Sequence, residues 1–256
     1  MGARTYRTVL IGSGNVASFL KEHIAGPFEV MQVKGRSLTQ SSPKGKGLKS
    51  LPLGEAFEEA ALYIIAVSDR AIPSVAEELK DVKGLVVHTA GSVPMDILKQ
   101  SRRGVLYPLQ TISKARKLPA SKVPFYIEAS REEDLGLLRL LAESMGSKAT
   151  PMTSEKRRYL HLAAVFCCNF VNRLYGITAD LLAEHDIPFS SMLPLIHETA
   201  DKVEELTPHQ AQTGPAVRWD EEVMAQQMTL LDDEQRELYQ LLSKSIHDDK
   251  LRFDKD

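Results

Sequence analysis

Residues 9–17 read VLIGSGNVA, and this stretch decides the fold of the chain. The apolar run predicts a strand that ends at Gly12, and the pattern that follows predicts a helix. Gly12 allows a tight turn, Gly14 lets the backbone approach a pyrophosphate, and Ala17 lets the helix pack closely on the strand. The amides at the helix start would then bind the anion. We therefore expect a dinucleotide to bind at Gly12, Ser13, Gly14, Asn15 and Val16.

The second predicted strand, residues 29–33, refines the choice of nucleotide. It leads into Lys34-Gly35-Arg36-Ser37, a segment without Asp or Glu. Sites that prefer NAD place a carboxylate about 20 residues beyond the glycines, where it would repel a 2′-phosphate. Arg36 and Ser37 could instead bind that phosphate through guanidinium and hydroxyl groups. The segment favours NADP over NAD; the alternative is that Arg36 only begins a solvated loop.

Short apolar runs alternate with helical patterns through the rest of the first 151 residues. The predicted strands cover residues 8–12, 61–67, 84–88, 104–107, 124–129 and 147–151, and the helices cover 15–24, 72–79, 94–99 and 132–145. This order predicts an α/β fold with a doubly wound parallel sheet. Residues 37–53 and 110–123 are predicted to be exposed loops.

Small and polar residues follow three of the predicted strands. They are Val67-Ser68-Asp69, then His88-Thr89, then Tyr107 to Gln110. Ligands of open α/β sheets bind beyond the carboxyl ends of strands, so these segments should line one crevice. His88 is a candidate acid–base group, although a histidine at a strand end can simply be held by hydrogen bonds. Asp69 could equally cap the following helix.

The pattern changes after Pro151. One long helix is predicted over residues 153–184, with Thr153 as its N-cap, and further helices over 192–206, 218–231 and 233–247. We therefore expect two domains: a nucleotide-binding domain over residues 1–151 and an all-α domain over residues 152–256.

The two faces of the long helix differ in character. Helical phase places Tyr159, Ala163, Phe166, Phe170, Ile177 and Leu181 on one face, which we expect to be the buried stripe. The opposite face carries His161, Val165, Cys168 and Asn172, with Asn169 to one side. A cleft lining or a contact between helices or subunits would suit this weakly polar face.

Composition excludes several classes of function. The chain has 32 Lys and Arg against 34 Asp and Glu, and a net charge of −2, so no overall basic field exists to attract nucleic acid or an anionic membrane. The first eight residues do not resemble a secretory signal, and no apolar run approaches the ~20 residues that span a bilayer. The two cysteines are adjacent, which indicates a reducing compartment. We expect a cytoplasmic protein without a metal site.

Six stretches together resemble a known family. They are VLIGSGNVA (9–17), IIAVSDRAI (64–72), VVHTAGSVP (86–94), YPLQT (107–111), HLAAVFCCNF (161–170) and TGPAVRWD (213–220). The chain resembles the Rossmann-like, functionally uncharacterised oxidoreductases related to deazaflavin-dependent NADP oxidoreductases and pyrroline-5-carboxylate reductases. More distantly it is similar to 6-phosphogluconate and 3-hydroxyacid dehydrogenases.

The resemblance implies a Rossmann domain, NADP as cofactor, and a helical domain that often mediates dimerisation. It also implies that the segment Val67, Ser68 and Asp69 lies near the ribose and nicotinamide, and Thr89, at the end of the next strand, is a further candidate cofactor residue. The hydroxyacid dehydrogenases carry a catalytic lysine one helical turn before an asparagine. If Asn169 is that asparagine, Val165 stands where the lysine would be, and a valine cannot transfer protons. Either other groups, such as His88, His161 or Tyr107, transfer the proton, or the protein is not a dehydrogenase of that kind.

The expected function is an NADP-dependent oxidoreductase. Hydride would pass between the nicotinamide and a small molecule bound between the two domains. The candidate catalytic residues are His88, His161 and Asn169, and the candidate substrate residues are Gln110, Asn172 and Arg218. Arg218 could hold an anionic group of the substrate, or form a surface salt bridge. The protein is expected to be a homodimer; the alternative is a non-catalytic nucleotide-binding sensor or assembly module, and no residue selects for a deazaflavin.

Overall fold

The structure is a computed structural model that describes residues 5–35, 49–51 and 56–253. It comprises two compact units, Met1–Asn169 and Phe170–Asp256. The division between the units falls inside the long helix, whereas the sequence pattern changes at residue 151.

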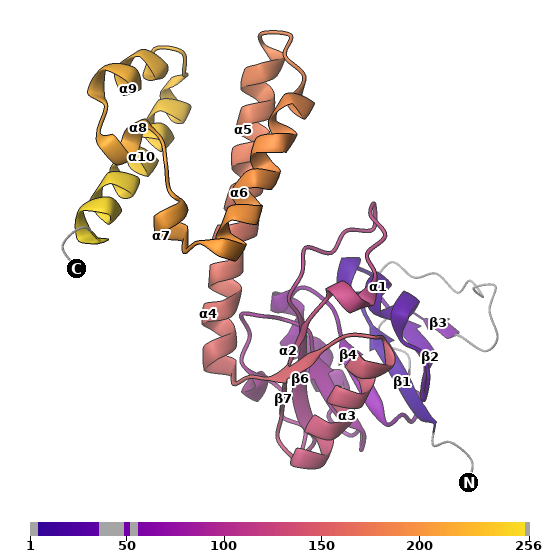
Figure 1. Cartoon of the computed structure of the whole chain (residues 1–256). Coiled ribbons are helices and arrows are strands. Elements are labelled where there is room, and N and C mark those ends of the chain that lie inside the picture. The colour runs from indigo at the N-terminus through magenta and orange to yellow at the C-terminus, as the bar shows by residue number, and fades with distance from the viewer. Residues whose placement is uncertain (1–4, 36–48, 52–55, 254–256) are drawn as a thin grey trace. The chain divides into compact units, whose positions relative to one another are not determined.

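The described part of the first unit is built on one eight-stranded sheet of order β3-β2-β1-β4-β5-β6-β7-β8 (Figure 1). The strands are β1 (Tyr6–Ile11), β2 (Phe28–Lys34), β3 (Lys49–Leu51), β4 (Leu62–Ile65), β5 (Leu85–His88), β6 (Arg103–Pro108), β7 (Phe125–Ala129) and β8 (Ala149–Pro151). The first six strands have the 3-2-1-4-5-6 order of a doubly wound nucleotide-binding sheet. The predicted fold class is confirmed.

Two features of the sheet differ from the prediction. β7 pairs antiparallel with β6, because the segment that joins them contains only the short turn Ala120–Lys122 and no crossover helix. The sheet is therefore mostly parallel rather than wholly parallel. The segment 37–53, predicted to be a loop, includes β3, which pairs with the end of β2.

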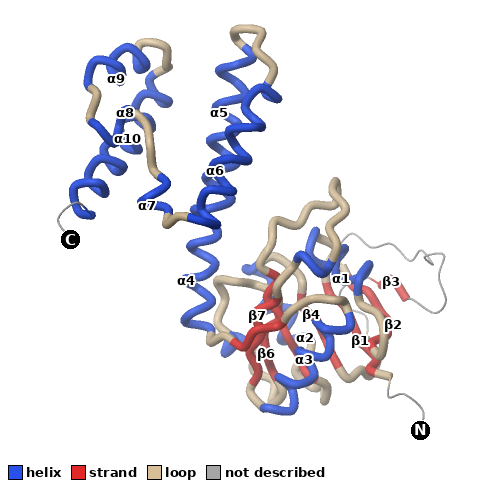
Figure 2. Tube along the Cα trace, viewed as in Figure 1, coloured by secondary structure: helices blue, strands red, loops and turns tan. Residues whose placement is uncertain are grey.

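Helices cover both faces of the sheet (Figure 2). They are α1 (Asn15–His23), α2 (Ile72–Glu78) and α3 (Glu132–Ser144). Alternate residues of β1 belong to different core clusters, because successive side chains of a strand point to opposite faces. Leu10 packs in the cluster of Leu20 and Leu141, whereas Val9 packs in the cluster of Leu79. The sheet is thus buried on both sides and exposes its strand ends for binding.

Helices make up the chain after residue 153. They are α4 (Ser154–Ala164), a π-helical turn (Val165–Phe170), α5 (Val171–Ala183), α6 (Leu193–Glu205), α7 (Pro208–Ala211), α8 (Pro215–Arg218), α9 (Glu221–Met228) and α10 (Asp233–Phe253). Thr153 is the N-cap of α4, as predicted, and its side chain accepts a hydrogen bond from the backbone N–H of Lys156 at 3.4 Å. The predicted all-α C-terminal part is confirmed.

The predicted buried stripe of the long helix was wrong for its aromatic residues. Tyr159, Phe166 and Phe170 are 71%, 62% and 51% exposed. An apolar period shows that a face avoids water, but it does not show that the same chain covers that face. The π-helical turn also breaks the 100° phase on which the prediction relied.

The same helix has the length and apolar composition of a possible membrane span. Over Ser154–Ala183 an 18-residue window reaches a mean hydropathy of 1.3, and it is the one such helix among the described residues. Sequence analysis did not identify it, because charged residues interrupt the run. A single helix that meets criteria of length and composition alone is weak evidence for a membrane.

Candidate active site

The glycine turn after β1 has the geometry that its sequence predicts. Gly12 has a φ of +140°, and a Cβ added there would lie 2.0 Å from the carbonyl oxygen of Ala66. Only glycine fits such a position. Gly14 differs, because a Cβ added there would meet nothing within 4 Å. Gly12 therefore serves the fold, whereas the space beside Gly14 is open to a ligand.

A cavity of about 610 Å³ lies beyond the carboxyl ends of the central strands. The predicted residues that line it are Gly12, Ser13, Gly14, Asn15, Val16, Val67, Ser68, Asp69, Thr89, Gln110 and His161. Gly35, Gly91, Tyr107 and Pro108 complete much of the remaining wall. The structure thus brings together strand ends that are far apart in sequence, as predicted from the sheet topology.

The start of α1, on the cavity wall, could hold the diphosphate of a dinucleotide. Gly14 is the N-cap of this helix and offers no side-chain cap to the first-turn amides, which are the usual anion donors of such sites. The Lys114 ammonium lies at the same turn and donates a hydrogen bond to the carbonyl oxygen of Ser13 at 2.7 Å. Sequence analysis missed Lys114, because only the fold brings residues 13 and 114 together.

Asp69 lies at the edge of the cavity and does not cap the following turn. Its Oδ2 accepts a hydrogen bond of 2.5 Å from the Ser92 hydroxyl, and Ser68 takes the N-cap position instead. The bond joins the segment after β4 to the segment after β5. Asp69 therefore fixes the shape of the cavity wall.

A tyrosine–histidine pair forms the other side of the cavity. The Tyr107 hydroxyl lies 2.9 Å from Nδ1 of His161, and the two rings meet edge to face at 5.8 Å. Gly91 permits this arrangement, because a Cβ at that position would lie 2.7 Å from the His161 ring. Sequence analysis identified His161 but could not pair it with Tyr107, which comes from β6.

Burial keeps the Tyr107 hydroxyl protonated. Desolvation raises the pKa of Tyr107 to about 12, and the positive charge of Arg157 opposes this shift only in part. The phenol is therefore a hydrogen-bond donor at neutral pH. We assign the proton of this hydrogen bond to Tyr107, which makes Nδ1 of His161 the acceptor and leaves Nε2 for a substrate.

A buried ion pair fixes the first turns of α4. Nη1 of Arg157 lies 2.5 Å from Oε2 of Glu128, and its Nη2 donates to the carbonyl oxygen of Val93 at 2.7 Å. The Ser154 hydroxyl donates to the same Glu128 oxygen at 2.6 Å. Arg157 is fully buried in a helix whose other residues are partly or fully exposed. The pair joins α4 to β7 and to the segment after β5.

His88 does not occupy a catalytic position. Its side chain is fully buried and does not line the cavity. Nδ1 accepts a hydrogen bond from the backbone N–H of Ala90 at 3.2 Å, and Nε2 lies 3.4 Å from the carbonyl oxygen of Pro94. The structure thus favours the alternative that hydrogen bonds hold this histidine in place. Desolvation and the charge of Arg157 lower the pKa of His88 to about 4.

This lowered pKa predicts a loss of stability in acid. In the unfolded chain His88 titrates near 6.5, so between pH 6.5 and about 4 the unfolded state binds more protons than the folded state. The free energy of unfolding should therefore fall as the pH drops through this window, by about 3 kcal/mol in total from this one group. Urea unfolding at a series of pH values measures the loss. His88→Gln should flatten the curve, and parallel curves for both proteins would contradict the assignment.

A second cavity, of about 310 Å³, adjoins the first. It shares Tyr107, Gln110 and His161 with the first cavity, the one at the glycine turn, which is called the nucleotide cavity below. Its other walls come from the loop after β6 and from α4 with the π-helical turn, and they include Asn169. Asn169 therefore lies near the candidate site, and a catalytic role for it stays a prediction.

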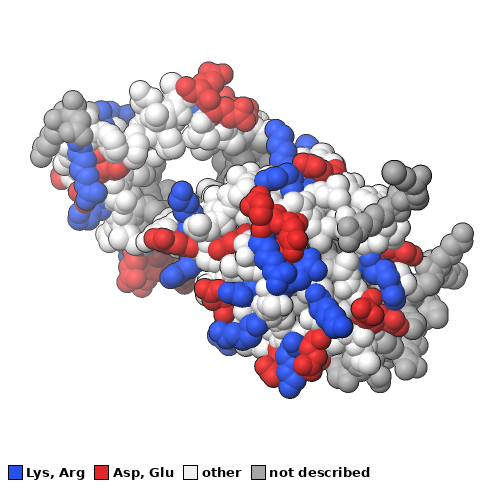
Figure 3. Space-filling model, turned by 90° about the horizontal axis from the view of Figure 1, so that it is seen from below, with Lys and Arg blue, Asp and Glu red and all other residues white. Residues whose placement is uncertain are grey.

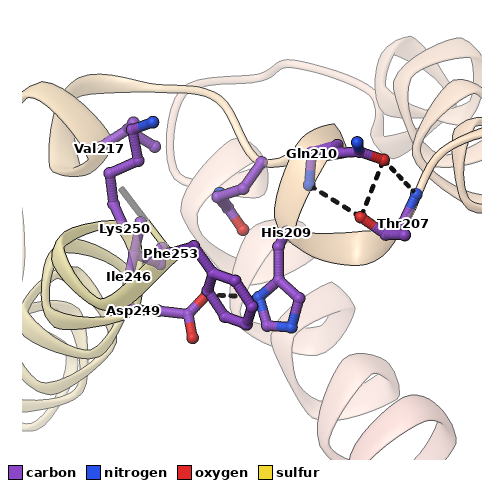
Figure 4. A pocket seen from close by; sticks show the side chains of 9 residues that line it. Thr207, His209, Gln210, Val217, Ile246, Asp249, Lys250 and Phe253 are labelled. Atoms are coloured by element: carbon purple, nitrogen blue, oxygen red, sulfur yellow. Dashed lines mark hydrogen bonds and ion pairs between the residues drawn. The ribbon is translucent and has the colours of Figure 1, made fainter. Parts of the chain in front are cut away.

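A third cavity, of about 490 Å³, belongs to the second unit (Figure 4). Nδ1 of His209 lies 2.6 Å from Oδ2 of Asp249, and the His209 ring stacks on Phe253 at 3.8 Å. These contacts tie α7 to α10, which explains both side chains structurally. Thr207, whose hydroxyl is bound to Gln210, forms the cap of α7.

The remaining predicted residues lie elsewhere. Asn172 and Arg218 are exposed residues of the second unit and line none of these three cavities. Arg36 and Ser37 lie outside the described residues. Among the described residues, no group of three or more His, Cys, Asp or Glu side chains could hold a metal ion.

Comparisons with known proteins agree with this geometry. The chain is 38% identical to a putative NADP oxidoreductase from Bacteroides fragilis, with a TM-score of 0.84, and the match covers 96% of this chain and 100% of that one. A protein from Thermotoga maritima is 23% identical over 96% of this chain and 98% of that chain, with a TM-score of 0.69. Pyrroline carboxylate reductase from Plasmodium falciparum, with NADP bound, is 13% identical over 96% of this chain and 100% of that chain, with a TM-score of 0.59. The last two likenesses show the fold alone.

The fold and the site define a Rossmann-type nucleotide-binding protein with a helical C-terminal region. Residues 123–246 match a family described as a domain of unknown function, DUF2520. No curated protein matches the sequence. The chain belongs to the family of NADP oxidoreductase-like Rossmann proteins that includes the Bacteroides fragilis protein, so the predicted resemblance is confirmed.

Proposed function

We propose that this protein is an NADP-dependent oxidoreductase that transfers hydride to or from a small molecule. The observation that carries the proposal is the Tyr107–His161 pair, which lies in the wall of the same cavity as the glycine turn. Relatives support it, since one is named an NADP oxidoreductase and another was solved with NADP bound. A substrate position between the two domains stays a prediction.

The chemistry divides between the cofactor and the chain. A bound nicotinamide supplies or accepts the hydride. His161 directs Nε2–H to the substrate, where it can give its proton to the oxygen or nitrogen that gains charge when hydride adds to carbon, while Nδ1 takes the proton of the Tyr107 hydroxyl, which solvent then replaces. The Tyr107 hydroxyl holds the imidazole ring through Nδ1 and keeps its orientation fixed. Asn169 remains a candidate for a further contact.

The proposed preference for NADP rests on the segment after β2. Gly35 lines the nucleotide cavity, and Arg36 and Ser37 follow it directly in the sequence. The described residues of the cavity wall include one carboxylate, Asp69, which the Ser92 hydroxyl already binds. No acidic residue in the segment 34–37 is available to repel a 2′-phosphate.

Substitution of Arg36 tests the cofactor assignment. We expect micromolar binding of NADPH by titration calorimetry and a loss of at least about 10-fold in Arg36→Asp, because a charge-assisted hydrogen bond is replaced by repulsion. Affinity for NADH should change little, and Arg36→Gln should be intermediate. If neither nucleotide binds, the oxidoreductase proposal fails. If NADPH binds but no carbonyl compound is ever reduced, the sensor or assembly function becomes the better explanation.

We further propose a cytoplasmic homodimer that binds neither nucleic acid nor membrane. The exposed aromatic residues of the long helix support a contact between two copies, and Figure 3 shows basic and acidic side chains interspersed on the face drawn. Static light scattering measures the assembly directly. A mass of 28.5 kDa, that of one chain, would contradict the dimer.

A further inference from the structure

The cavity that adjoins the nucleotide cavity has walls without charge. It is named here the side cavity, and its described lining contains no Lys, Arg, Asp or Glu. Leu109, Leu160, Ala164 and Val165 supply an apolar surface, and the Tyr107–His161 pair lies where this cavity meets the nucleotide cavity. The side cavity is therefore mostly apolar, with the paired hydroxyl and imidazole at the nucleotide end.

The described lining of the side cavity contains no Lys or Arg that could pair with an anion bound there. Arg157 influences the pKa of Tyr107, but its guanidinium is fully buried and already binds Glu128 and the Val93 carbonyl oxygen. Asp69, on the wall of the neighbouring nucleotide cavity, adds a negative charge. A carboxylate in the side cavity would lose part of its hydration without gaining a cationic partner from the lining, which is unfavourable.

The backbone of the long helix is widened where it lines the side cavity. The π-helical turn Val165–Phe170 supplies Val165, Cys168 and Asn169 to the wall. Such turns are uncommon and occur frequently at functional sites, since they shift side chains from regular helical positions. Cys168 is half-buried in this wall and provides a chemical reporter of its occupancy.

We infer that the side cavity binds an uncharged, compact and largely apolar substrate with one carbonyl or imine group. This inference rests on the proposed function and names its substrate class. The reactive group would lie at the Tyr107–His161 pair, where NADPH gives hydride to its carbon and Nε2 of His161 gives a proton to its oxygen or nitrogen as Nδ1 takes the Tyr107 proton; solvent then reprotonates Tyr107, and the products are an alcohol or amine and NADP⁺. Substrates with a carboxylate are excluded, which removes the need for Arg218 as an anion-binding residue.

Protection of Cys168 from alkylation tests the inference without requiring turnover. The full-length Cys167→Ser protein is treated with N-ethylmaleimide in the presence of benzamide or benzoate, and modified Cys168 is measured by mass spectrometry. The two probes have the same shape and differ in charge. We expect benzamide to protect Cys168 at a concentration at least roughly 10-fold lower than benzoate, because the carboxylate has no partner in the cavity.

A matched pair of variants shows whether charge decides the result. Ala164→Lys adds a cation to the wall and should shift protection toward benzoate, whereas Ala164→Met adds similar bulk without charge and should not. Equal or better protection by benzoate in the Cys167→Ser protein would overturn the inference, and so would no protection by either probe. The negative charge of bound benzoate also disfavours the reactive thiolate of Cys168. This effect slows alkylation, so it can only overstate the protection that benzoate gives. The measurement needs no nucleotide, so its failure is distinct from failure to bind NADPH.

Discussion

His161→Gln is expected to lower kcat by about 10²- to 10⁴-fold for any carbonyl compound that the protein reduces, the range typical of a lost general acid–base group. Affinity for NADPH should stay within about twofold, because the described hydrogen bond of the His161 side chain is to Tyr107 and not to the glycine turn. Tyr107→Phe should have a smaller effect on kcat, because it releases the His161 imidazole from its hydrogen bond but leaves the imidazole in place.

Steady-state kinetics and calorimetry on the same preparations separate the two quantities. His209→Gln provides the matched control, because it makes the same substitution at a histidine paired with Asp249 in the second unit. Unchanged kcat in His161→Gln would exclude the histidine as the proton donor. A loss of NADPH binding together with kcat would show instead that His161 has a structural role.

Gly12→Ala is expected to destabilise the first unit by about 2–6 kcal/mol. Non-glycine residues at such a φ cost roughly 1–3 kcal/mol, and overpacking costs about the same again. The added Cβ would lie 2.0 Å from a backbone oxygen, which cannot move away as a side chain could. The midpoint of urea unfolding should fall accordingly, and the protein should accumulate poorly on expression.

Gly14→Ala should give the opposite pattern. Its Cβ points into open space, so the free energy of unfolding should change by less than about 1 kcal/mol. NADPH affinity should nevertheless fall by 10-fold or more, on the order of one lost charge-assisted contact, because the methyl group occupies the space beside the first-turn amides. If Gly14→Ala binds NADPH normally, the diphosphate does not lie at this turn.

Local patterns were sufficient to predict that the glycine turn and the strand ends line one cavity. The glycine turn, the strand ends and the Thr153 cap each depend on a few adjacent residues. The antiparallel β6–β7 pair and the short β3 were missed, since neither has a strong local pattern. The Tyr107–His161 pair was missed because its partners are 54 residues apart and meet only in the folded chain. The aromatic stripe was assigned to a buried face because a sequence shows polarity but not what covers it.

The buried Arg157–Glu128 pair has a consequence for the rotation of helix α4 about its own axis. Apolar contacts let a helix roll or slide at little cost, whereas an ion pair with a second hydrogen bond to a fixed carbonyl holds one rotational setting. Arg157 and His161 are one turn apart on the same face, so the setting of the first fixes the direction of the second. In the proposed reaction, the direction of the His161 ring therefore depends on an ion pair whose residues line neither cavity. Substitutions at the positions of α4 other than Arg157 and His161 can be tolerated as long as the Arg157–Glu128 pair keeps its geometry.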